Sequence, residues 1–563
     1  MGNLTEYDVA IVGGGIGGIY TGWRLATSPL AGDPAKWAGP DGKLKIAVFE
    51  GSDRIGGRLL SAIPPGMPDT ICELGGMRYV SSQTLVRSLI ENKLKLERTE
   101  QVVYRPENIA HLRGQFLRFS QVTDPEALPY DLQWAEAQWV SQKNDPSGLM
   151  GWAITRIFPQ VGSLSGDALQ SFLQSAQVDG IPLYQHGFWN LLARAMSFEA
   201  YQLSKTLVGY DCLGNNANAV DLTSCYFDFT PDVKYYLLNG SYEAVPWILE
   251  EQFKTAGGEV HLNTWLTFFD QTTLADGSQG VELHFKDGRA PVKARAIVLA
   301  MPQRSLRLLS PRGPVLDPAR APQFQSLLGS VMPIPLYKIF VGYNYPWWEA
   351  MGVTQGRSFT ELPVRQCYYW GNNVNPSPKP DSTNSVIMVY DDSSNVDFWG
   401  GLRITAEKQA HNLREHPDSP VLFNRKTTPE QTAPASAPSG DPFADRLRKN
   451  WVSHAAPKLL VDETHRQLMT MHNAQYAPDP TEAAFADWCD DPYGGAVHLW
   501  NRGYKSWILV DDMTQPVENF PCYICGEAYS TNQTWAEGAL ETAEIVLQKR
   551  LHIPAPDWIT QNP

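Results

Sequence analysis

The sequence predicts a mixed α/β fold (α+β in part), in which a parallel sheet is interleaved with a domain built on an antiparallel sheet and with a helical lobe. Three observations support this fold class. An apolar N-terminal strand runs directly into a glycine-rich turn and a helix within residues 7–18. Buried strand-like segments return near residues 296–302 and 523–525. Between them lie a helix-prone aromatic stretch and alternating runs typical of antiparallel strands.

The glycine-rich turn follows the apolar segment YDVAIV. Gly13, Gly15 and Gly18 have the G-x-G-x-x-G spacing, and Gly17 lies between the last two. Such glycines permit a tight turn, a close approach of the backbone to a pyrophosphate, and close packing of helix on strand. The helix that follows directs its N-terminal N–H groups at the phosphates. The segment therefore predicts a Rossmann-type dinucleotide site.

A second predicted strand, Lys45–Phe49, ends in Glu50, an acid at the position where a ribose hydroxyl is held. The interval from the glycine-rich turn exceeds the usual ~20 residues. We therefore interpret Ser28–Gly42, which is rich in Pro, Gly and Asp, as a surface insertion. The segment Arg54-Ile55-Gly56-Gly57-Arg58 comes shortly after Glu50, and this position favours a cofactor contact over a surface turn.

This order of motifs resembles the flavin amine oxidase superfamily, in which an R-x-G-G-R segment follows the ribose-binding acid. The resemblance implies FAD as the cofactor, no metal, and a glycine pair beside the isoalloxazine within Glu73-Leu-Gly-Gly-Met-Arg78. Near the C-terminus, the segments from Gly526 and from Trp535 resemble the family's last flavin motif, with a helix that starts near Thr534. The predicted cofactor-binding residues are Gly13, Gly15, Gly17, Gly18, Glu50, Arg58, Gly76, Met77, Arg78, Leu266, Glu527, Trp535, Ala536 and Ala539.

The residues after the glycine pair separate the branches of this superfamily. Amine-specific members lack a cation there, whereas L-amino acid oxidases have Met-Arg, and here these residues are Met77 and Arg78. The resemblance implies that Arg78 binds the substrate carboxylate, and a planar guanidinium suits a bidentate, charge-assisted pair. The alternative is an arginine in a salt bridge with a neighbouring acid. The resemblance also gives roles to Tyr390 (a second carboxylate contact), Lys338 (near flavin N5 through a water) and Trp535 (a wall of the substrate cage).

The position of Lys338 in the sequence supports a role in the site more strongly than the position of Tyr390 does. Lys338 lies inside the apolar run Leu336–Tyr343, where an ammonium group is costly unless it reaches a cavity or a partner. Tyr390 ends the run Ser385–Tyr390, and a core tyrosine of a sheet would give the same pattern. Thr534 stands where the family often has glycine, which leaves the geometry of the substrate amine open.

These residues predict an FAD-dependent L-amino acid oxidase that takes an L-amino acid and dioxygen. Hydride transfer to the flavin, reoxidation by dioxygen to hydrogen peroxide and hydrolysis of the imine would give a 2-oxo acid and ammonia. The segment Asp491-Pro-Tyr-Gly-Gly495, with His498 and Trp500, resembles bacterial L-amino acid and L-arginine oxidases. It favours a basic or broad preference. Asp490 and Asp491 are examples of acids that would meet a substrate guanidinium, but the sequence does not place them in the pocket.

Three alternatives stay open at this point: a monoamine or polyamine oxidase, an L-amino acid monooxygenase, and a flavoprotein-like binding module without activity. A cation at Arg78 opposes the first, because it would face a positively charged substrate. Nothing in the sequence separates the monooxygenase from the oxidase.

The composition of the chain excludes some classes of binding partner and indicates a cellular compartment. The 60 acidic and 46 basic residues give a net charge of −14, which argues against a nucleic acid. No run of eighteen apolar residues predicts a membrane span. The N-terminus lacks a basic, apolar leader, and seven scattered cysteines fit a reduced compartment, so we expect a cytoplasmic protein. Cys522 and Cys525 have redox-motif spacing but apolar neighbours, which favours a buried strand. Eighteen tryptophans and 23 tyrosines are compatible with a homodimer interface, and equally with core and site lining.

We divide the chain into FAD-binding segments at 1–105, 228–310 and 488–563, a helical lobe at 106–227, and a substrate-binding domain at 311–487. The substrate-binding domain contains the predicted antiparallel sheet. Within it, Thr427–Gly440 has low complexity, and we expect a surface loop there.

Overall fold

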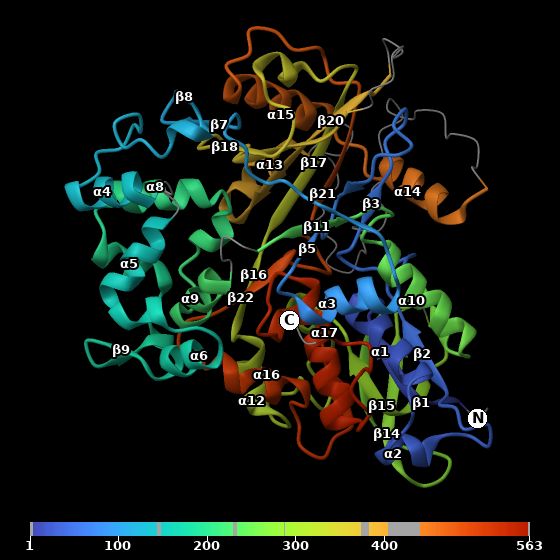
Figure 1. Cartoon of the computed structure of the whole chain (residues 1–563). Helices are drawn as coiled ribbons and strands as arrows, with labels where there is room; N and C mark the ends of the chain where they lie inside the picture. Colours follow the sequence, from blue (N-terminus) through green and yellow to red (C-terminus); the bar gives the residue numbers. More distant parts are fainter. Residues whose placement is uncertain are drawn as a thin grey trace.

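The computed structural model describes residues 4–143, 148–228, 233–286, 288–372, 382–403 and 440–560. The predicted loop at 427–440 lies outside the described residues except for its last residue. Three groups of elements are visible in Figure 1: a parallel sheet with helices near the N-terminus, an antiparallel sheet with orange helices above it, and a cyan and green helical group at the left.

The first sheet has a parallel centre, as the glycine-rich motif predicts. β1 (Thr5–Val12) pairs in parallel with both β2 and β15, and the strand order is β12-β2-β1-β15-β14-β13, with β23 also parallel to β15. β14 and β13 complete the sheet in antiparallel orientation. The other strands are β2 (Ile46–Phe49), β12 (Glu259–His261), β13 (Leu266–Thr273), β14 (Gln279–Phe285), β15 (Val292–Leu299) and β23 (Cys522–Ile524).

The strands of this sheet come from three distant parts of the chain, which explains why buried strand sequence returns along it. Three helices cover one face: α1 (Ile16–Thr27), α10 (Ala244–Thr255) and α17 (Ala536–Ile545). α1 packs between α10 and α17, and the apolar side chains of all three share one buried core with β1 and β2. Apolar burial of this kind is the main stabilising term for such layers.

The second sheet is antiparallel except for one pair. Its order is β21-β17-β20-β19-β18-β7-β8, and only β18 and β7 run parallel. Every residue of β17 and β20 is buried, because α13 (Val396–Leu402) and α15 (Lys458–Met471) cover one face and segment 60–77, with Trp451 and Trp488, covers the other. The strands are β7 (Ile109–Leu112), β8 (Gln115–Arg118), β17 (Leu336–Tyr343), β18 (Arg357–Thr360), β19 (Gln366–Asn372), β20 (Ser385–Asp392) and β21 (Glu482–Asp487).

β7 and β8 correct one sequence expectation. They fall in segment 106–227, which the sequence predicts as a helical lobe. Instead, they extend the antiparallel sheet by pairing with β18, and no local sequence pattern predicts that pairing. The domain boundaries themselves stay a prediction. The helices of this region are α4 (Trp134–Lys143), α5 (Leu149–Ile157), α6 (Gly166–Ser175), α7 (Phe188–Ala195), α8 (Phe198–Val208) and α9 (Ala219–Asp228).

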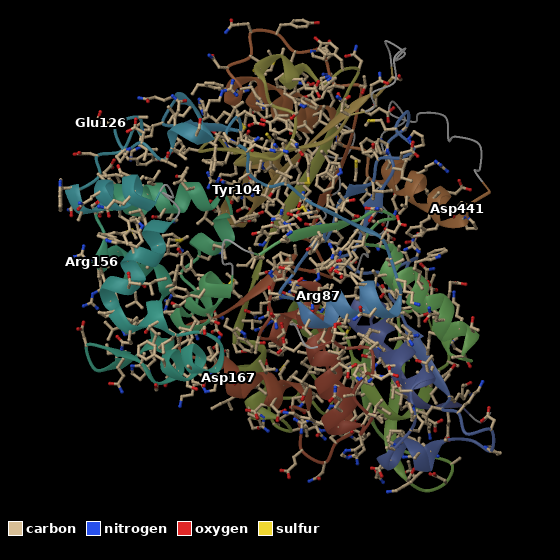
Figure 2. The ribbon with its side chains drawn as sticks, in the orientation of Figure 1. Arg87, Tyr104, Glu126, Arg156, Asp167 and Asp441 are labelled. Carbon is tan, nitrogen blue, oxygen red and sulfur yellow. The ribbon has the colours of Figure 1, made fainter. Side chains whose placement is uncertain are left out.

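Local signals explain the ends of α8. The Ser197 side chain accepts the backbone N–H of Ala200 as an N-cap, Glu199 lies in the first turn, and Gly209 ends the helix at a φ of 71°. On the outer side of this helical group lie the exposed side chains of Glu126, Arg156 and Asp167 (Figure 2).

Shorter elements connect these groups. A three-stranded sheet of order β5-β11-β6 links the parallel sheet with the helical group. Across the described ranges, no helix has both the length and the apolar character needed to cross a bilayer. Cys522 and Cys525 are buried free thiols, as the strand interpretation predicts. The shorter elements are α2 (Gly32–Trp37), β3 (Ser61–Ala62), β4 (Cys72–Glu73), β5 (Tyr79–Val80), α3 (Thr84–Ser88), β6 (Arg98–Glu100), β9 (Gln177–Val178), β10 (Ile181–Pro182), β11 (Tyr235–Leu238), α11 (Gln303–Arg307), α12 (Pro322–Leu328), β16 (Val331–Ile334), α14 (Pro442–Ser453), β22 (Val497–Trp500) and α16 (Ser506–Thr514).

Candidate active site

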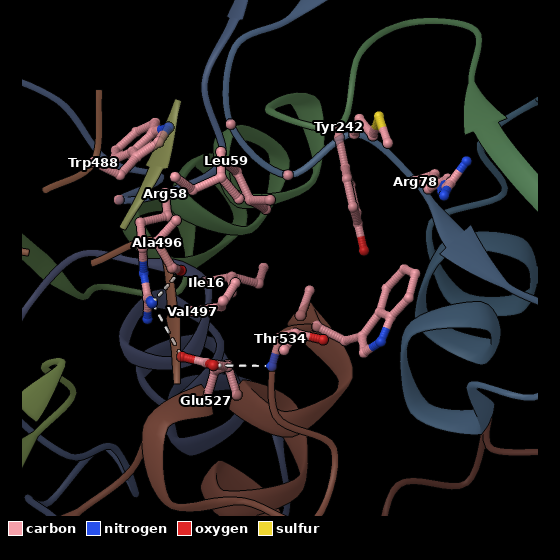
Figure 3. Close-up of a pocket in the computed structure, with 18 of the residues that line it drawn as sticks. Ile16, Arg58, Leu59, Arg78, Tyr242, Trp488, Ala496, Val497, Glu527 and Thr534 are labelled. Atoms are coloured by element: carbon pink, nitrogen blue, oxygen red, sulfur yellow. Dashed lines mark hydrogen bonds and ion pairs between the residues drawn. The ribbon is translucent and has the colours of Figure 1, made fainter. Parts of the chain in front are cut away.

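A cavity of about 940 Å³ lies where the three groups of elements meet. Its lining includes every predicted cofactor-binding residue except Gly18, together with Lys338 and Tyr390. Figure 3 shows Arg58 and Glu527 at one end of the cavity and Arg78 at the other. We call the first the dinucleotide end, lined by Gly13, Glu50, Arg58 and Glu527, and the second the arginine end, lined by Arg78, Tyr104, Tyr210 and Tyr235.

At the dinucleotide end, the carboxylate of Glu50 is held in place by backbone donors. It accepts the N–H of Gly14 at 2.5 Å and the N–H of Ser52 at 2.8 Å. A Cβ on Gly57 would lie 3.0 Å from the Cα of Gly15, and Gly57 has a φ of 57°, so only glycine suits this approach of two backbones. The acid and the two glycine-rich turns therefore form one rigid cradle.

Gly18 differs in position from the other predicted cofactor-binding residues. It does not line the cavity, and a Cβ on it would lie 1.9 Å from the carbonyl oxygen of Gly13. Gly18 is thus required for the packing of α1 against the turn after β1. This is the third role that the G-x-G-x-x-G spacing predicts, and it needs no contact with a ligand.

Glu527 joins several parts of the dinucleotide end. Its carboxylate accepts the backbone N–H groups of His498 at 2.8 Å and Thr534 at 2.9 Å, and it pairs with Arg58 at 3.0 Å (Figure 3). His498 Nδ1 also lies 2.9 Å from the carboxylate. Burial opposes the charge of Glu527, but the nearby His498 and Arg58 lower its pKa to about 2. Glu527 is therefore an anion that fixes Arg58 and the entry to α17.

The N-terminus of α17 points into the cavity. Trp535 is its N-cap residue, and Thr534, Trp535, Ala536 and Ala539 line the wall. Thr534 has a φ of 75°, a left-handed conformation that costs a β-branched residue about 1–2 kcal/mol. Glycine adopts this conformation without that cost. The backbone N–H groups at the start of α17 and the positive end of its dipole make this wall suited to negative charge.

The dinucleotide end fits FAD by its chemistry. It combines a glycine cradle at the start of α1, a carboxylate on backbone N–H groups, an arginine, and a second helix N-terminus. The first helix start suits a pyrophosphate, the acid suits a ribose, and the second helix start suits an electron-rich ring. The residue roles themselves stay predictions.

Strand register places Lys338 and Tyr390 side by side. Lys338 of β17 is opposite Tyr390 of β20, and Tyr390 is opposite Gln366 of β19. The Lys338 ammonium donates to the carbonyl oxygens of Glu73, at 3.2 Å, and Gly75. Burial and Arg78 lower the pKa of Lys338 to about 7, against the opposing effect of Glu73. The ammonium thus reaches both a partner and the cavity, as its position in an apolar strand predicts.

The hydrogen-bond partners of Arg78 are neutral side chains. Its guanidinium donates to Gln101 Oε1 at 2.9 Å and to the Tyr210 hydroxyl at 2.9 Å, and it lies 4.3 Å from the ring centre of Tyr235. Arg78 is only 7% exposed, and no acidic side chain among the described residues pairs with it. The alternative of a structural salt bridge at Arg78 is therefore wrong within the described part of the chain. A buried guanidinium with no anion favours an anionic ligand.

Two acids proposed as partners of a substrate guanidinium lie elsewhere. Asp490 pairs with Arg403 at 2.8 Å, and Asp491 pairs with Arg304 at 2.5 Å. Neither lines the cavity, whereas Pro492 and Tyr493 from the same segment do. The expectation for Asp490 and Asp491 is therefore corrected, because each acid already has a cationic partner.

Sequence reasoning missed Tyr210, Tyr368 and Arg357, which surround Arg78. Tyr210 follows α8 in a region without a motif, and Tyr368 is one of many strand tyrosines. Arg357 has a signal that could have found it. It is a fully buried cation in a short strand of buried residues, and the argument used for Lys338 applies equally to it.

With this geometry in place, comparison with known proteins decides the family. Residues 37–410 match the family described as flavin containing amine oxidoreductase. The chain belongs to that family. FAD is its cofactor, and the resemblance to the flavin amine oxidase superfamily is confirmed.

Relatives of this flavin amine oxidoreductase extend over most of its length. Aplysianin-A from Aplysia kurodai is 26% identical over 96% of this chain and 89% of its own. An L-amino-acid oxidase from Mus musculus is 23% identical over 64% of this chain and 51% of its own. A redesigned putrescine oxidase has a similar structure, with a TM-score of 0.62 at 16% identity over 97% of this chain and 98% of its own. At that identity, the likeness to putrescine oxidase shows the fold alone.

Proposed function

We propose that this flavin amine oxidoreductase is an L-amino acid oxidase. The observation that supports it most is Arg78, a buried guanidinium at the cavity wall with no acidic partner among the described residues. A cation there opposes a positively charged amine and attracts a carboxylate. Arg78 directly follows Gly75, Gly76 and Met77, all of which line the cavity. A carboxylate on Arg78 would therefore bring the rest of an amino acid close to the cofactor.

Each residue of the proposed site has a physical task. Arg78 binds the carboxylate, and Tyr390, whose side chain lies at the same wall, gives the second contact. Lys338, with a pKa lowered to about 7, holds or releases a proton near neutral pH. Trp535 limits the space for the substrate and excludes water. Bound FAD supplies the acceptor for two electrons from the Cα–H bond, and dioxygen restores it, giving hydrogen peroxide. The residues thus orient the substrate rather than act as a strong base.

We propose a broad side-chain preference and a cytoplasmic location. Asp490 and Asp491 are paired outside the cavity, so they give no support to a specific preference for arginine. The cavity wall beyond Arg78 is formed mainly by apolar side chains of the helical group, such as Met150, Phe188 and Leu207. The location is supported by six free cysteines among the described residues.

The test is peroxide release by the purified yellow holoenzyme. L-arginine, L-leucine, L-glutamate, D-arginine and agmatine are compared at equal concentration. We expect peroxide, a 2-oxo acid and ammonia from the L-amino acids, and none from agmatine, which lacks the carboxylate. Turnover of agmatine would replace the proposal with an amine oxidase. Consumption of an L-amino acid without peroxide, with an amide and carbon dioxide as products, would replace it with a monooxygenase.

A further inference from the structure

Two buried guanidinium groups lie close together without a carboxylate. Arg357 is 0% exposed and donates to Gln366 Oε1 at 3.0 Å, to the Val208 carbonyl oxygen at 3.3 Å, and to the Tyr104 hydroxyl at 2.5 Å. Within the described ranges, no acidic side chain pairs with Arg357 or with Arg78. Because an uncompensated buried charge is costly, this pair favours any group nearby that can become negative.

Tyr368 is the group placed to do so. It lies directly opposite Arg357 in the pairing of β18 with β19, so both side chains leave the same face of the sheet. Its ring centre is 5.8 Å from the Arg78 guanidinium, and its hydroxyl is 2.7 Å from the Tyr210 hydroxyl. The Tyr210 oxygen already accepts a hydrogen bond from Arg78. Its own proton is therefore available to donate to the Tyr368 oxygen, which makes Tyr368 the acceptor of the pair.

Two cations and one hydrogen-bond donor beside Tyr368 favour its anion. The charged neighbours are Arg78 and Arg357, and the neutral ones include Tyr210 and Tyr235. Burial opposes ionisation, but the two guanidinium groups outweigh it and lower the pKa of Tyr368 below its ordinary value. For Tyr235, burial outweighs the effect of Arg78, and the pKa is raised. Two tyrosines beside the same guanidinium thus differ in their response to pH.

We propose that Tyr368 is a positioning residue that controls carboxylate binding at Arg78. As a phenol, Tyr368 leaves the guanidinium charge for the ligand; as a phenolate at alkaline pH, it occupies that charge and competes with the ligand. The inference rests on the proposed role of Arg78 in binding the carboxylate. Ionisation of Tyr368 and binding of the carboxylate are linked thermodynamically, because each disfavours the other.

The linkage has a defined sign. Below the pKa of Tyr368, the titration of this residue gives the affinity for a carboxylate no pH dependence. Above it, a proton must be taken up when the ligand binds, so affinity falls by up to about tenfold for each further pH unit. Lys338, whose pKa is about 7, titrates earlier. A ligand without an amine removes the titration of the substrate itself from the measurement.

The experiment measures the dissociation constant of benzoate from the oxidised holoenzyme between pH 6 and 10, by the change in flavin absorbance. Wild type, Tyr368→Phe and the matched control Tyr235→Phe are compared. We expect wild type and Tyr235→Phe to lose affinity at the alkaline end by up to about tenfold per pH unit, and Tyr368→Phe to lose none beyond the Lys338 effect. Near-ultraviolet phenolate absorbance should rise with pH in wild type, fall when benzoate is added, and be reduced in Tyr368→Phe.

Four outcomes would overturn the inference. The alkaline loss could persist in Tyr368→Phe, or benzoate could leave the phenolate absorbance of wild type unchanged. In both cases, tight benzoate binding at neutral pH that Arg78→Lys weakens would leave the proposed carboxylate site standing. If wild type fails to bind benzoate at any pH, or Arg78→Lys binds it equally well, the carboxylate site is wrong and the inference fails with it.

Discussion

The two ends of the cavity are built in different ways. The dinucleotide end consists mostly of backbone: glycine turns, N–H groups on Glu50, and the start of α17. The arginine end is lined by long side chains from β11, β20 and the segments after β4, β6 and α8, and Arg357 of β18 and Tyr368 of β19 lie next to Arg78. Backbone recognition needs glycines and helix starts at defined local spacing. Side-chain recognition needs only that distant strands meet in the correct register.

This difference teaches where substitutions should act. At the dinucleotide end, a change should affect how much FAD the protein retains. At the arginine end, it should affect substrate binding while the flavin stays bound. Arg78→Ala and Glu50→Gln test this separation, and Lys338→Met and Thr534→Gly test the stability of the cavity wall. The four follow in order of falling effect.

Arg78→Ala should have the largest effect. Loss of a bidentate, charge-assisted pair of about 3 kcal/mol lowers kcat/KM for L-amino acids by about a hundredfold or more. The flavin content should stay that of wild type. Steady-state kinetics with L-leucine, together with the flavin absorbance, measures both. Arg156→Ala, at an exposed position of the helical group, is the control for loss of one positive charge. Equal kcat/KM in Arg78→Ala and wild type would refute the carboxylate assignment.

Glu50→Gln should have the second largest effect, which is a loss of affinity for FAD. Removal of the charge weakens two hydrogen bonds from backbone N–H groups and the contact expected with a ribose, about 2 kcal/mol in total. FAD affinity, measured by titration of the apoprotein, should fall by about thirtyfold. Glu100→Gln, at the far side of the cavity, should retain FAD like wild type. Unchanged FAD affinity in Glu50→Gln would mean that the acid only holds its own turn.

Lys338→Met tests how much stability the buried ammonium group of Lys338 costs the folded protein. The folded pKa of Lys338 is lowered from 10.5 to about 7, so between these values the unfolded chain binds more protons. The residue therefore costs stability that is greatest below pH 7 and disappears as pH rises toward 10.5. Urea unfolding should show Lys338→Met to be more stable by about 2 kcal/mol at pH 6, with the difference shrinking by pH 10. A difference that does not depend on pH would show that folding does not lower the pKa of Lys338.

Thr534→Gly should have the smallest effect. The left-handed backbone of Thr534 is strained, and glycine relieves this strain at the cost of greater freedom in the unfolded chain. We expect a gain of up to about 1 kcal/mol in the free energy of unfolding. Thr534→Ala, which retains a Cβ, is the control and should give no gain. A loss of stability in the glycine variant would show that the Thr534 side chain makes a contact of its own.

Most of the dinucleotide end could be predicted from the sequence, and Gly18 shows the limit. The spacing of Gly13, Gly15 and Gly18 identified the cradle and predicts a packing role for one glycine, but it did not exclude a cofactor contact for Gly18. The tertiary structure places Gly18 in the packing role, because a Cβ on Gly18 would lie 1.9 Å from the Gly13 carbonyl oxygen. The prediction that Asp490 or Asp491 meets a substrate guanidinium was wrong for a related reason. Each acid pairs with an arginine that is distant in the chain, and the sequence does not show such pairs.

The sequence by itself determined the parallel sheet, the FAD cradle and the antiparallel strands of Lys338 and Tyr390. These features depend on interactions within a few residues: a glycine that permits a turn, an N–H group that meets an anion, and an alternation that matches a strand. The tertiary structure alone decided that Arg357, Tyr368 and Tyr210 surround Arg78. Their assembly depends on strand register and on packing between distant segments. No local pattern encodes such neighbours, because the free energy that brings them together comes from burial of the whole core.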